Sequence, residues 1–377
     1  MAGRVAVALL SAVALTAAGV GWVTAHEFKA STNVTTALAE VQHDEPAQTQ
    51  HDDGATDILL VGDDSRTDAQ GHPLPTTVLD TLRTQFDSGL NTDTIILLRL
   101  SHTTGRAYAV SIPRDTYVSI PGYRTDKINS AYGVIKSRTK STTAGQRALI
   151  ETVQNLTGVH IDHYVEVNLY GFYLLSEAIG GIRVCLRRST SDPDSGADFA
   201  AGVQDVSGGR ALSFVRQREG LPNGDLGRIV RQQVFLASAA HKVLSAGTLT
   251  SPHRLSALMN AMRKSVITDP GMDLAMVVQE AQALLAGKIE FVTIPVVNSN
   301  ARSPRGQSIV QVNAAQVHQF VAGLTGTPKA APTTTAKPAP ASKPAPTAKP
   351  APTKAHTTPA PKAPTPPVSI GGVPCVD

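Results

Sequence analysis

The sequence predicts an α/β protein, a three-layer α/β/α sandwich with a central mixed sheet, over residues 57–325 of the 377-residue chain. Two observations lead to this prediction. Short apolar runs recur along the segment, and each is closed by glycine, proline or a charged residue, as buried strands are. Longer stretches with helical periodicity lie between them. Helices that alternate with apolar strands favour a sheet covered by helices on both faces.

The predicted elements can be placed in chain order. Strands are expected at Asp57–Val61, Ile95–Leu100, Ala107–Ile112, Tyr164–Val167, Ile182–Leu186 and Glu290–Pro295. Helices are expected at Val78–Phe86, Ala144–Leu156, Gly171–Ala178, Leu255–Val266 and Leu274–Leu285, with another that begins near Leu226. A hairpin turn through His102–Gly105 joins the second and third strands. The segment from Tyr164 to Leu186 is predicted to form a βαβ unit.

The residues before the domain divide into three parts. Residues 5–25 are an uncharged apolar run long enough to span a bilayer as a helix. Arg4 precedes the run, so residues 1–4 are expected in the cytoplasm and the body of the chain outside it. A cleaved signal peptide is the alternative, because Val23-Thr24-Ala25 resembles a cleavage site. Residues 26–56 are polar and are predicted to be a juxtamembrane linker, with a short helix near Val34–Val41.

The positive net charge of the chain comes from its tail. Residues 326–367 are rich in proline, alanine and threonine and are expected to be disordered and extended. They hold six lysines and no acid, so the rest of the chain has a net charge of about −2 rather than the overall +4. Because the basic residues are concentrated in a tail, the folded part is not predicted to bind nucleic acid.

The last ten residues, 368–377, are apolar again and contain Cys375. Cys185 is the only other cysteine in the sequence. In an exported chain this pair is a candidate disulfide, which would fold the tail back onto the domain. Two unrelated thiols are the alternative.

Four arginines gather in a short stretch, FVRQREGLPNGDLGRIVRQ, from Phe214 to Gln232. Arg216 and Arg218 are predicted to alternate on a strand end, so that both point to one face. A glycine-rich loop follows, and Arg228 and Arg231 lie in the first turns of the next helix. Guanidinium groups beside a helix N-terminus match an anion such as phosphate. The alternative is a solvated basic patch that Glu219 and Asp225 balance.

Carboxylates mark the ends of the predicted strands. Asp63 and Asp64 follow the first strand, Asp93 precedes the second, and Pro113-Arg114-Asp115 ends the third. Active sites of α/β sheets are commonly built at such strand ends. Helix caps and loop solubilisers are the alternative reading of each acid.

Eight motifs occur in order between about Asp57 and Pro295: ILLVGDDSR, NTDT, SIPRD, KIN, EVNLYGF, AIGGIRV, FVRQR and GDLGRIVRQQ. Together they resemble the LytR-CpsA-Psr family of cell-wall enzymes. The resemblance implies a single-pass membrane protein with an extracytoplasmic catalytic domain. It also implies transfer of a glycopolymer from a polyprenyl-pyrophosphate carrier to peptidoglycan, with formation of a phosphodiester bond. The sequence does not identify the glycopolymer.

The resemblance also assigns residues. Asp64 and Asp93 would hold Mg²⁺, for which carboxylates and pyrophosphate oxygens are suitable ligands. Asp93, Arg114, Arg216 and Arg218 would be catalytic. Lys127, Arg228, Arg231, Gln232 and Asn91 would bind the pyrophosphate, and the prenyl chain would lie in an apolar channel between sheet and helices.

One position departs from the family pattern. The family commonly has RSDT where this chain has Asn91-Thr92-Asp93-Thr94, so Asn91 replaces an arginine. The alternative function is therefore a non-catalytic scaffold that binds polyprenyl-linked or wall polymers. A transcriptional regulator fits poorly, because the body is predicted to be exported and no DNA-reading motif is present.

Overall fold

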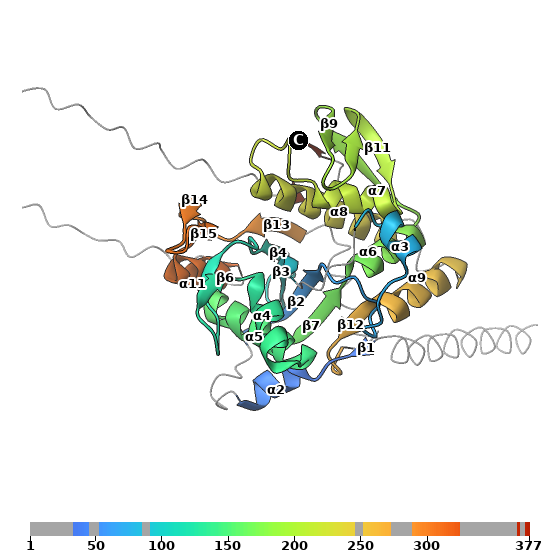
Figure 1. Ribbon diagram of the computed structural model, residues 1–377. Coiled ribbons are helices and arrows are strands. Elements are labelled where there is room, and N and C mark those ends of the chain that lie inside the picture. Colours follow the sequence, from blue (N-terminus) through green and yellow to red (C-terminus); the bar gives the residue numbers. More distant parts are fainter. Residues whose placement is uncertain are drawn as a thin grey trace, which may run out of the picture.

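The computed structural model describes residues 33–44, 53–84, 91–245, 252–272, 289–324, 368–369 and 374–377. Within these residues the centre is an eight-stranded sheet with parallel and antiparallel pairs (Figure 1). In spatial order its strands are β1 (Asn33–Val34), β12 (Val266–Thr268), β7 (His163–Val167), β2 (Ala55–Asp63), β3 (Thr92–Ser101), β4 (Ala107–Ser111), β13 (Ile289–Thr293) and β16 (Val368–Ser369). The prediction of an α/β fold with a central mixed sheet is confirmed.

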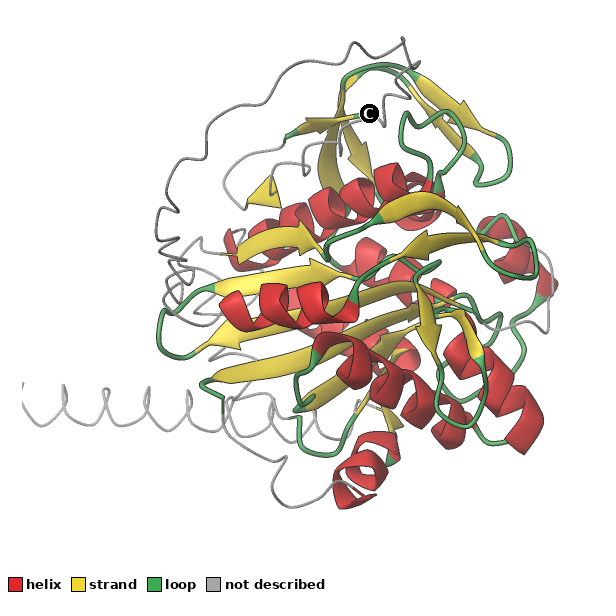
Figure 2. Ribbon diagram, turned by 90° about the vertical axis from the view of Figure 1, so that its left-hand side faces the viewer, coloured by secondary structure: helices red, strands yellow, loops and turns green. Residues whose placement is uncertain are grey.

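Helices cover both faces of this sheet (Figure 2), because successive strand residues point to opposite sides. Ile58 packs into one apolar cluster and Leu59 into the other. The cluster around Leu59 is covered by α2 (Ala37–Asp44), α4 (Ser130–Thr139), α5 (Thr142–Thr157) and α11 (Ala314–Gly323). The cluster around Ile58 is covered by α3 (Thr76–Thr81), α6 (Leu169–Ala178), α7 (Gly208–Arg216) and α8 (Asp225–Ser245), and α9 (Pro252–Ser265) packs on α6.

The predicted βαβ unit is wrong. β8 (Ile182–Leu186) leaves the main sheet and joins a three-stranded sheet between β11 (Gly202–Val206) and β17 (Cys375–Val376). Gly180 and Gly181, directly after α6, both have φ above +70°, a conformation that glycine adopts without strain. These two residues redirect the chain away from β7. The remaining strands form three hairpins: β5 (Tyr117–Ser119) with β6 (Thr125–Lys127), β9 (Thr190–Asp192) with β10 (Ala197–Phe199), and β14 (Asn298–Arg302) with β15 (Ser308–Gln311).

The folded unit begins before residue 57. β1 pairs with β12 at one edge of the main sheet, and α2 buries Ala37, Leu38 and Val41 against α5 and the sheet. The short helix expected near Val34–Val41 is present as α2, slightly later in the chain. The sequence alone predicts a linker here, because the few apolar residues form a run too short to show periodicity.

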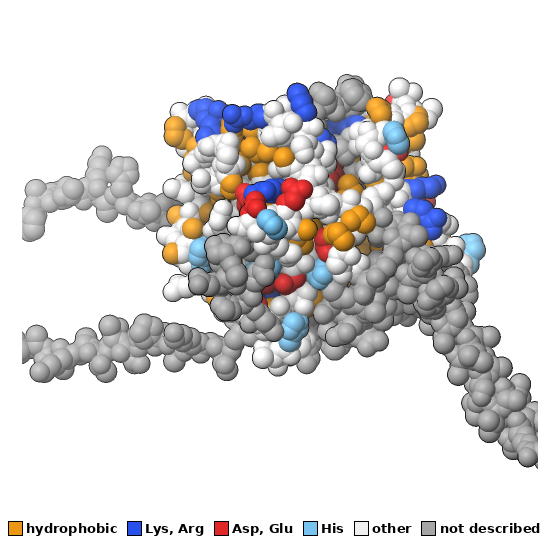
Figure 3. Space-filling model, turned by 90° about the horizontal axis from the view of Figure 1, so that it is seen from below, with side chains coloured by type: hydrophobic (Ala, Val, Ile, Leu, Met, Phe, Trp, Pro, Cys, Tyr) orange, Lys and Arg blue, Asp and Glu red, His pale blue; other side chains and the backbone are white. Residues whose placement is uncertain are grey.

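Several predicted segments lie outside the described residues: the N-terminal residues 1–4, the apolar run 5–25, the helix at 274–285 and the tail 326–367. Among the described helices, none has the length and hydropathy needed to cross a bilayer. Seen from below, the described surface carries basic, acidic and histidine side chains side by side (Figure 3).

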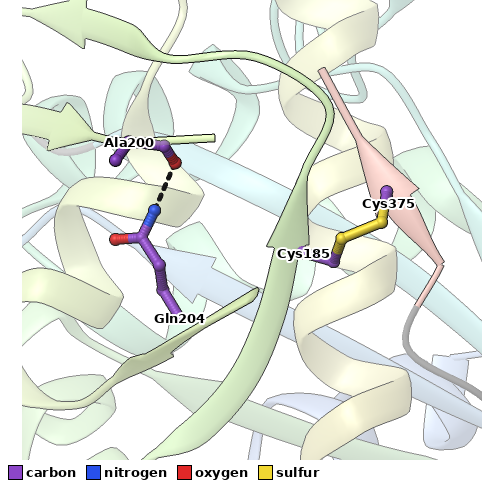
Figure 4. The surroundings of a disulfide bond; sticks show 4 residues. All are labelled: Cys185, Ala200, Gln204 and Cys375. Atoms are coloured by element: carbon purple, nitrogen blue, oxygen red, sulfur yellow. Dashed lines mark hydrogen bonds between the residues drawn. A yellow bond between two sulfur atoms is a disulfide. The ribbon is translucent and has the colours of Figure 1, made fainter. Parts of the chain in front are cut away.

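The two cysteines are joined in the structure. Cys185 in β8 and Cys375 in β17 are register partners in a parallel pair of strands and form a disulfide (Figure 4). This bond joins residues 374–377 to the three-stranded sheet, next to α8. The C-terminal residues are therefore part of the folded domain.

Candidate functional site

Two carboxylates meet because of how β2 and β3 pair. The strands are antiparallel, so the end of β2 lies beside the start of β3, and their register shifts between Gly62 and Asp63. A Cβ on Gly62 would lie 2.9 Å from the Cβ of Thr94, so the close approach requires glycine. Asp64, which follows β2, and Asp93, near the start of β3, consequently face one cavity.

That cavity has a volume of about 620 Å³ and lies between the main sheet and α6, α7 and α8. One end of it is polar and charged; its side chains there are Asp63, Asp64, Arg66, Asp93, Arg216, Arg228 and Gln232. The rest is apolar; among its lining residues are Leu60, Ile96, Val165, Phe172, Leu175, Leu212, Phe235, Leu236, Ala239, Ala240 and Val243.

One face of α8 lines the cavity from the charged end to the apolar end. Arg228 and Gln232 come first, Phe235 and Leu236 follow, and Val243 is the last. This spacing of about four residues keeps the side chains on one side of the helix. At 1.5 Å per residue, the helix between Arg228 and Val243 is about 22 Å long. The cavity is thus shaped for an elongated molecule with an anionic head and an apolar body.

Asp93 and Asp225 hold three arginines at the charged end. Arg114 Nη1 lies 2.7 Å from Asp93 Oδ1, and its Nε lies 3.3 Å from Asp225 Oδ1. Arg228 Nη2 lies 2.8 Å from the same Asp225 oxygen, and Nη1 lies 3.8 Å from Asp93 Oδ2. Arg218 is the outermost, 3.9 Å from Asp225 and about half exposed. The two acids fix the arginines without neutralising all of them.

The charge balance at this end favours an anion. Five arginines (Arg66, Arg114, Arg216, Arg218 and Arg228) and four aspartates (Asp63, Asp64, Asp93 and Asp225) gather here, which leaves a formal surplus of one positive charge. Arg228 is only 3% exposed, and its Nε has no hydrogen-bond partner in the described part of the chain. A buried donor of this kind is costly unless a ligand accepts its hydrogen bond.

The ionisation of Asp93 and that of Asp64 are shifted in opposite directions. Burial raises the pKa of Asp93, but the guanidinium groups of Arg114 and Arg228 outweigh it, so its pKa lies below the ordinary value. Burial raises the pKa of Asp64, and the Asp93 carboxylate adds to the rise. The Asn91 amide, which donates to Asp64 Oδ1 at 2.7 Å, and Arg66 oppose it only in part. A cation between Asp64 and Asp93 would relieve their repulsion.

Asp63 is in a different environment. It is 5% exposed, accepts a hydrogen bond from the Ser65 amide and lies against the buried Glu166. Burial, followed by the Glu166 carboxylate, raises the pKa of Asp63 to about 7. Tyr132 and Tyr164 donate their hydroxyls to Glu166. Asp64 is therefore the carboxylate of the pair that is available to a ligand.

Asp63→Asn is expected to stabilise the protein in a pH-dependent way. Because the pKa of Asp63 is higher in the folded than in the unfolded chain, its contribution to stability is greatest below pH 4 and is lost as the pH rises through about 7. The melting temperature of the variant should match that of the wild type at pH 4 and exceed it by about 3 °C or more at pH 8. A difference in melting temperature that stays the same from pH 4 to pH 8 would contradict the shared burial of Asp63 and Glu166.

The structure corrects the local prediction for Arg216 and Arg218. Arg216 is the last residue of a helix, α7, rather than part of a strand. Its Nη1 donates to the carbonyl of Leu82, and its guanidinium reaches the cavity. Arg218 lies just beyond the helix in the following loop. The apolar residues Leu212, Phe214 and Val215 fit a helix face as well as a strand, which is why the period was misread.

Two predicted ligands are not brought to the cavity. Lys127 pairs with Asp115 at 2.9 Å and is absent from the described cavity lining. Arg231 is fully buried behind α7, where its guanidinium contacts Gln217 and Asp377. Asn91 reaches the site through its backbone amide. The predicted residues that the structure does bring together at the charged end are Asp64, Asp93, Arg114, Arg216, Arg218, Arg228 and Gln232.

Two residues of the charged end were missed. Arg66 is in the cavity wall and pairs with Asp64, and Asp225 joins Arg114, Arg218 and Arg228. Arg66 belongs to the GDDSR motif, so its position beside Asp64 was available as a signal. Asp225 had been read only as a charge that balances the arginines.

Comparison with known proteins shows which proteins this chain resembles. Residues 22–325 match the model of the LytR_cpsA_psr family. Over 297 residues, 74% of this chain, the sequence is 45% identical to the cell wall biosynthesis protein LcpA of Corynebacterium glutamicum. It is 30% identical over 239 residues, 62% of this chain and 70% of the relative, to the polyisoprenyl-teichoic acid–peptidoglycan teichoic acid transferase TagU of Oceanobacillus iheyensis. The chain spans 57% of the length of the corynebacterial LcpA.

Solved structures share the fold. Bacillus subtilis TagV superposes with a TM-score of 0.55 at 22% identity and covers 73% of this chain and 97% of its own. A LytR-Csp2A-Psr enzyme from Actinomyces oris gives a TM-score of 0.55 at 19% identity, with 74% of this chain and 93% of its own covered.

Proposed function

The chain belongs to the LytR-CpsA-Psr family, and from this membership we propose that it transfers a cell-wall glycopolymer from a polyprenyl-pyrophosphate carrier to peptidoglycan. Its relatives are named for cell wall biosynthesis and for transfer of teichoic acid to peptidoglycan. One observation carries the proposal: the cavity combines an arginine-rich end with a long apolar body. A prenyl chain linked to a diphosphate likewise has an anionic head and a long apolar body.

The charged end fits the chemistry of this reaction. A hydroxyl of the acceptor attacks the phosphorus that bears the glycopolymer, and the P–O–P bond to the lipid phosphate breaks. A phosphodiester forms, polyprenyl phosphate leaves, and the hydroxyl proton passes to solvent. Such phosphoryl transfers depend on positioning and on neutralising charge. Arg114, Arg216 and Arg228 would bind the diphosphate oxygens, with Arg218 at the entrance.

Mg²⁺ is part of the proposal. Asp64 and Asp93 would be its protein ligands, because both are carboxylates on one wall of the cavity. Burial raises the pKa of Asp64, and the Asp93 carboxylate adds to the rise, which a bound cation would relieve. A bound Mg²⁺ would supply positive charge to the diphosphate oxygens. The low pKa of Asp93 suits metal ligation better than a role as general base.

Asn91 is compatible with catalysis in this arrangement. Its backbone amide holds Asp64, and the guanidinium of Arg66 lies 3.2 Å from the other Asp64 oxygen. A cation is thus present beside Asp64 although Asn91 brings none. We therefore favour an active transferase over a non-catalytic scaffold.

The location of the protein follows from the same function. Residues 5–25 would anchor the chain in the cell membrane, with residues 26–377 on the extracytoplasmic side, where a lipid-linked donor meets peptidoglycan. The apolar end of the cavity would receive the prenyl chain.

The direct test is cleavage of a polyprenyl pyrophosphate by the full-length protein in detergent. We expect release of inorganic phosphate with Mg²⁺ and none after EDTA treatment. Restoring Mg²⁺ should restore the rate. Tight binding of the lipid without any cleavage would overturn the proposed reaction and favour the scaffold.

A further inference from the structure

The segment Arg216-Gln217-Arg218 carries two of the site arginines, and a buried polar network holds it from behind. Gln217 itself points away from the cavity and is 0% exposed. Its Nε2 donates to Thr190 Oγ1 and to the carbonyl of Glu219 (3.0 Å). The side chain thus bridges β9 and the backbone directly after Arg218.

Arg231 supports Gln217 from the next helix. Its Nη1 donates to Gln217 Oε1 at 2.7 Å, and its Nε donates to the main-chain oxygen of Asp377 at 2.8 Å. The guanidinium lies over the Phe214 ring, 4.8 Å from the centroid. Burial lowers the pKa of Arg231 to about 10, against the opposing effect of Asp377. Two of the three guanidinium nitrogens, Nε and Nη1, are thus paired, while the buried Nη2 has no hydrogen-bond partner in the described part of the chain.

Asp192 holds the same segment from the other side. It is 1% exposed, and its Oδ2 accepts the backbone amides of Arg218 (2.9 Å) and Glu219 (3.3 Å). Its Oδ1 accepts the amides of Asp194 and Ser195. Asp194 and Glu219 stand close enough to Asp192 for a metal site, but both Asp192 oxygens are already used by backbone amides. The role of this acid is therefore to fix the loop.

We propose that Gln217, Arg231 and Asp192 are positioning residues that set the geometry of Arg218 on the diphosphate, and that the main-chain oxygen of Asp377 completes this support. The contacts run from Asp377 through Arg231 to Gln217, and from there to the carbonyl of Glu219, directly after Arg218. None of the three side chains lines the cavity among the described residues. The inference rests on the proposed function, because it assumes that Arg218 contacts a diphosphate.

A double-mutant cycle on the full-length protein tests it. Gln217→Ala should lower kcat for polyprenyl pyrophosphate cleavage about 10- to 100-fold, since small displacements of a catalytic group have effects of this size. In an Arg218→Ala background the same change should cost less than about 2-fold, because the group that Gln217 positions is gone. Calorimetric binding of inorganic pyrophosphate should show the same non-additivity without requiring turnover.

Gln233→Ala is the matched control. Like Gln217, Gln233 is a buried glutamine, but it lies in α8. Its Nε2 donates to Ser111, Val292 and Thr293 of the main sheet. This variant should lower the melting temperature and leave kcat unchanged. Equal effects of Gln217→Ala with and without Arg218, in kcat or in pyrophosphate binding, would overturn the positioning role. A wild type that binds pyrophosphate but does not cleave the lipid would instead overturn the proposed reaction, and the binding cycle would still decide this inference.

Discussion

Asp93→Ala is expected to lower kcat for polyprenyl pyrophosphate cleavage by at least about 100-fold, the usual cost of removing a group that stabilises transition-state charge. Asp93 contacts Arg114 at 2.7 Å and faces the cavity beside Asp64. Its loss removes a proposed Mg²⁺ ligand and one of the two acids that hold Arg114 and Arg228. The fold should survive, because Asp225 still pairs with Arg114 and Arg228. Rates at several Mg²⁺ concentrations, together with the melting temperature, provide the measurement.

Asp93→Asn separates the two roles of this carboxylate. Asparagine keeps an oxygen that can accept a hydrogen bond from Arg114 but lacks the negative charge that Mg²⁺ requires. If metal binding dominates, the asparagine variant should be as inactive as the alanine variant and should need a higher Mg²⁺ concentration. Near-normal activity of Asp93→Asn would show that Asp93 serves to orient Arg114, and the assignment of the metal to Asp93 would then be wrong.

The elements of the main sheet were predictable because burial on two faces leaves a simple pattern. In β2, Ile58 and Leu59 belong to opposite clusters, so the strand is an uninterrupted apolar run. Such a run closed by glycine is recognisable without any structure. The pairing of β2 with β3 then brings Asp64 and Asp93 together, which is why acids at strand ends were good candidates.

The arginine segment was harder to predict because its partners are distant in the sequence. Arg228 and Arg231 lie three residues apart in one helix, yet Arg228 reaches the cavity and Arg231 bonds to Asp377, 146 positions away. Gln217 lies between two site arginines but points into the core. The packing of α7, α8 and β9 determines which of these side chains faces the cavity and which is buried behind it.

The apolar part of the cavity gives the second large effect. Ala239 lies on the cavity face of α8, remote from the charged end, and its side chain borders the open space. Ala239→Trp should fill this space and displace part of the prenyl chain. Loss of roughly 120 Å² of apolar contact at about 25 cal/mol per Å² costs about 3 kcal/mol. The value of kcat/KM for a long-chain polyprenyl pyrophosphate should therefore fall about 100-fold.

A short, water-soluble prenyl diphosphate provides the internal comparison for this variant. Its head would contact the same arginines, but its chain is too short to reach Ala239, so its cleavage should be nearly unaffected. His241→Trp is the matched control, because His241 is exposed on the same helix and does not line the cavity. Equal losses of activity on the long and the short substrate would indicate damage at the charged end. An unchanged rate on the long substrate would place the prenyl chain elsewhere on the protein.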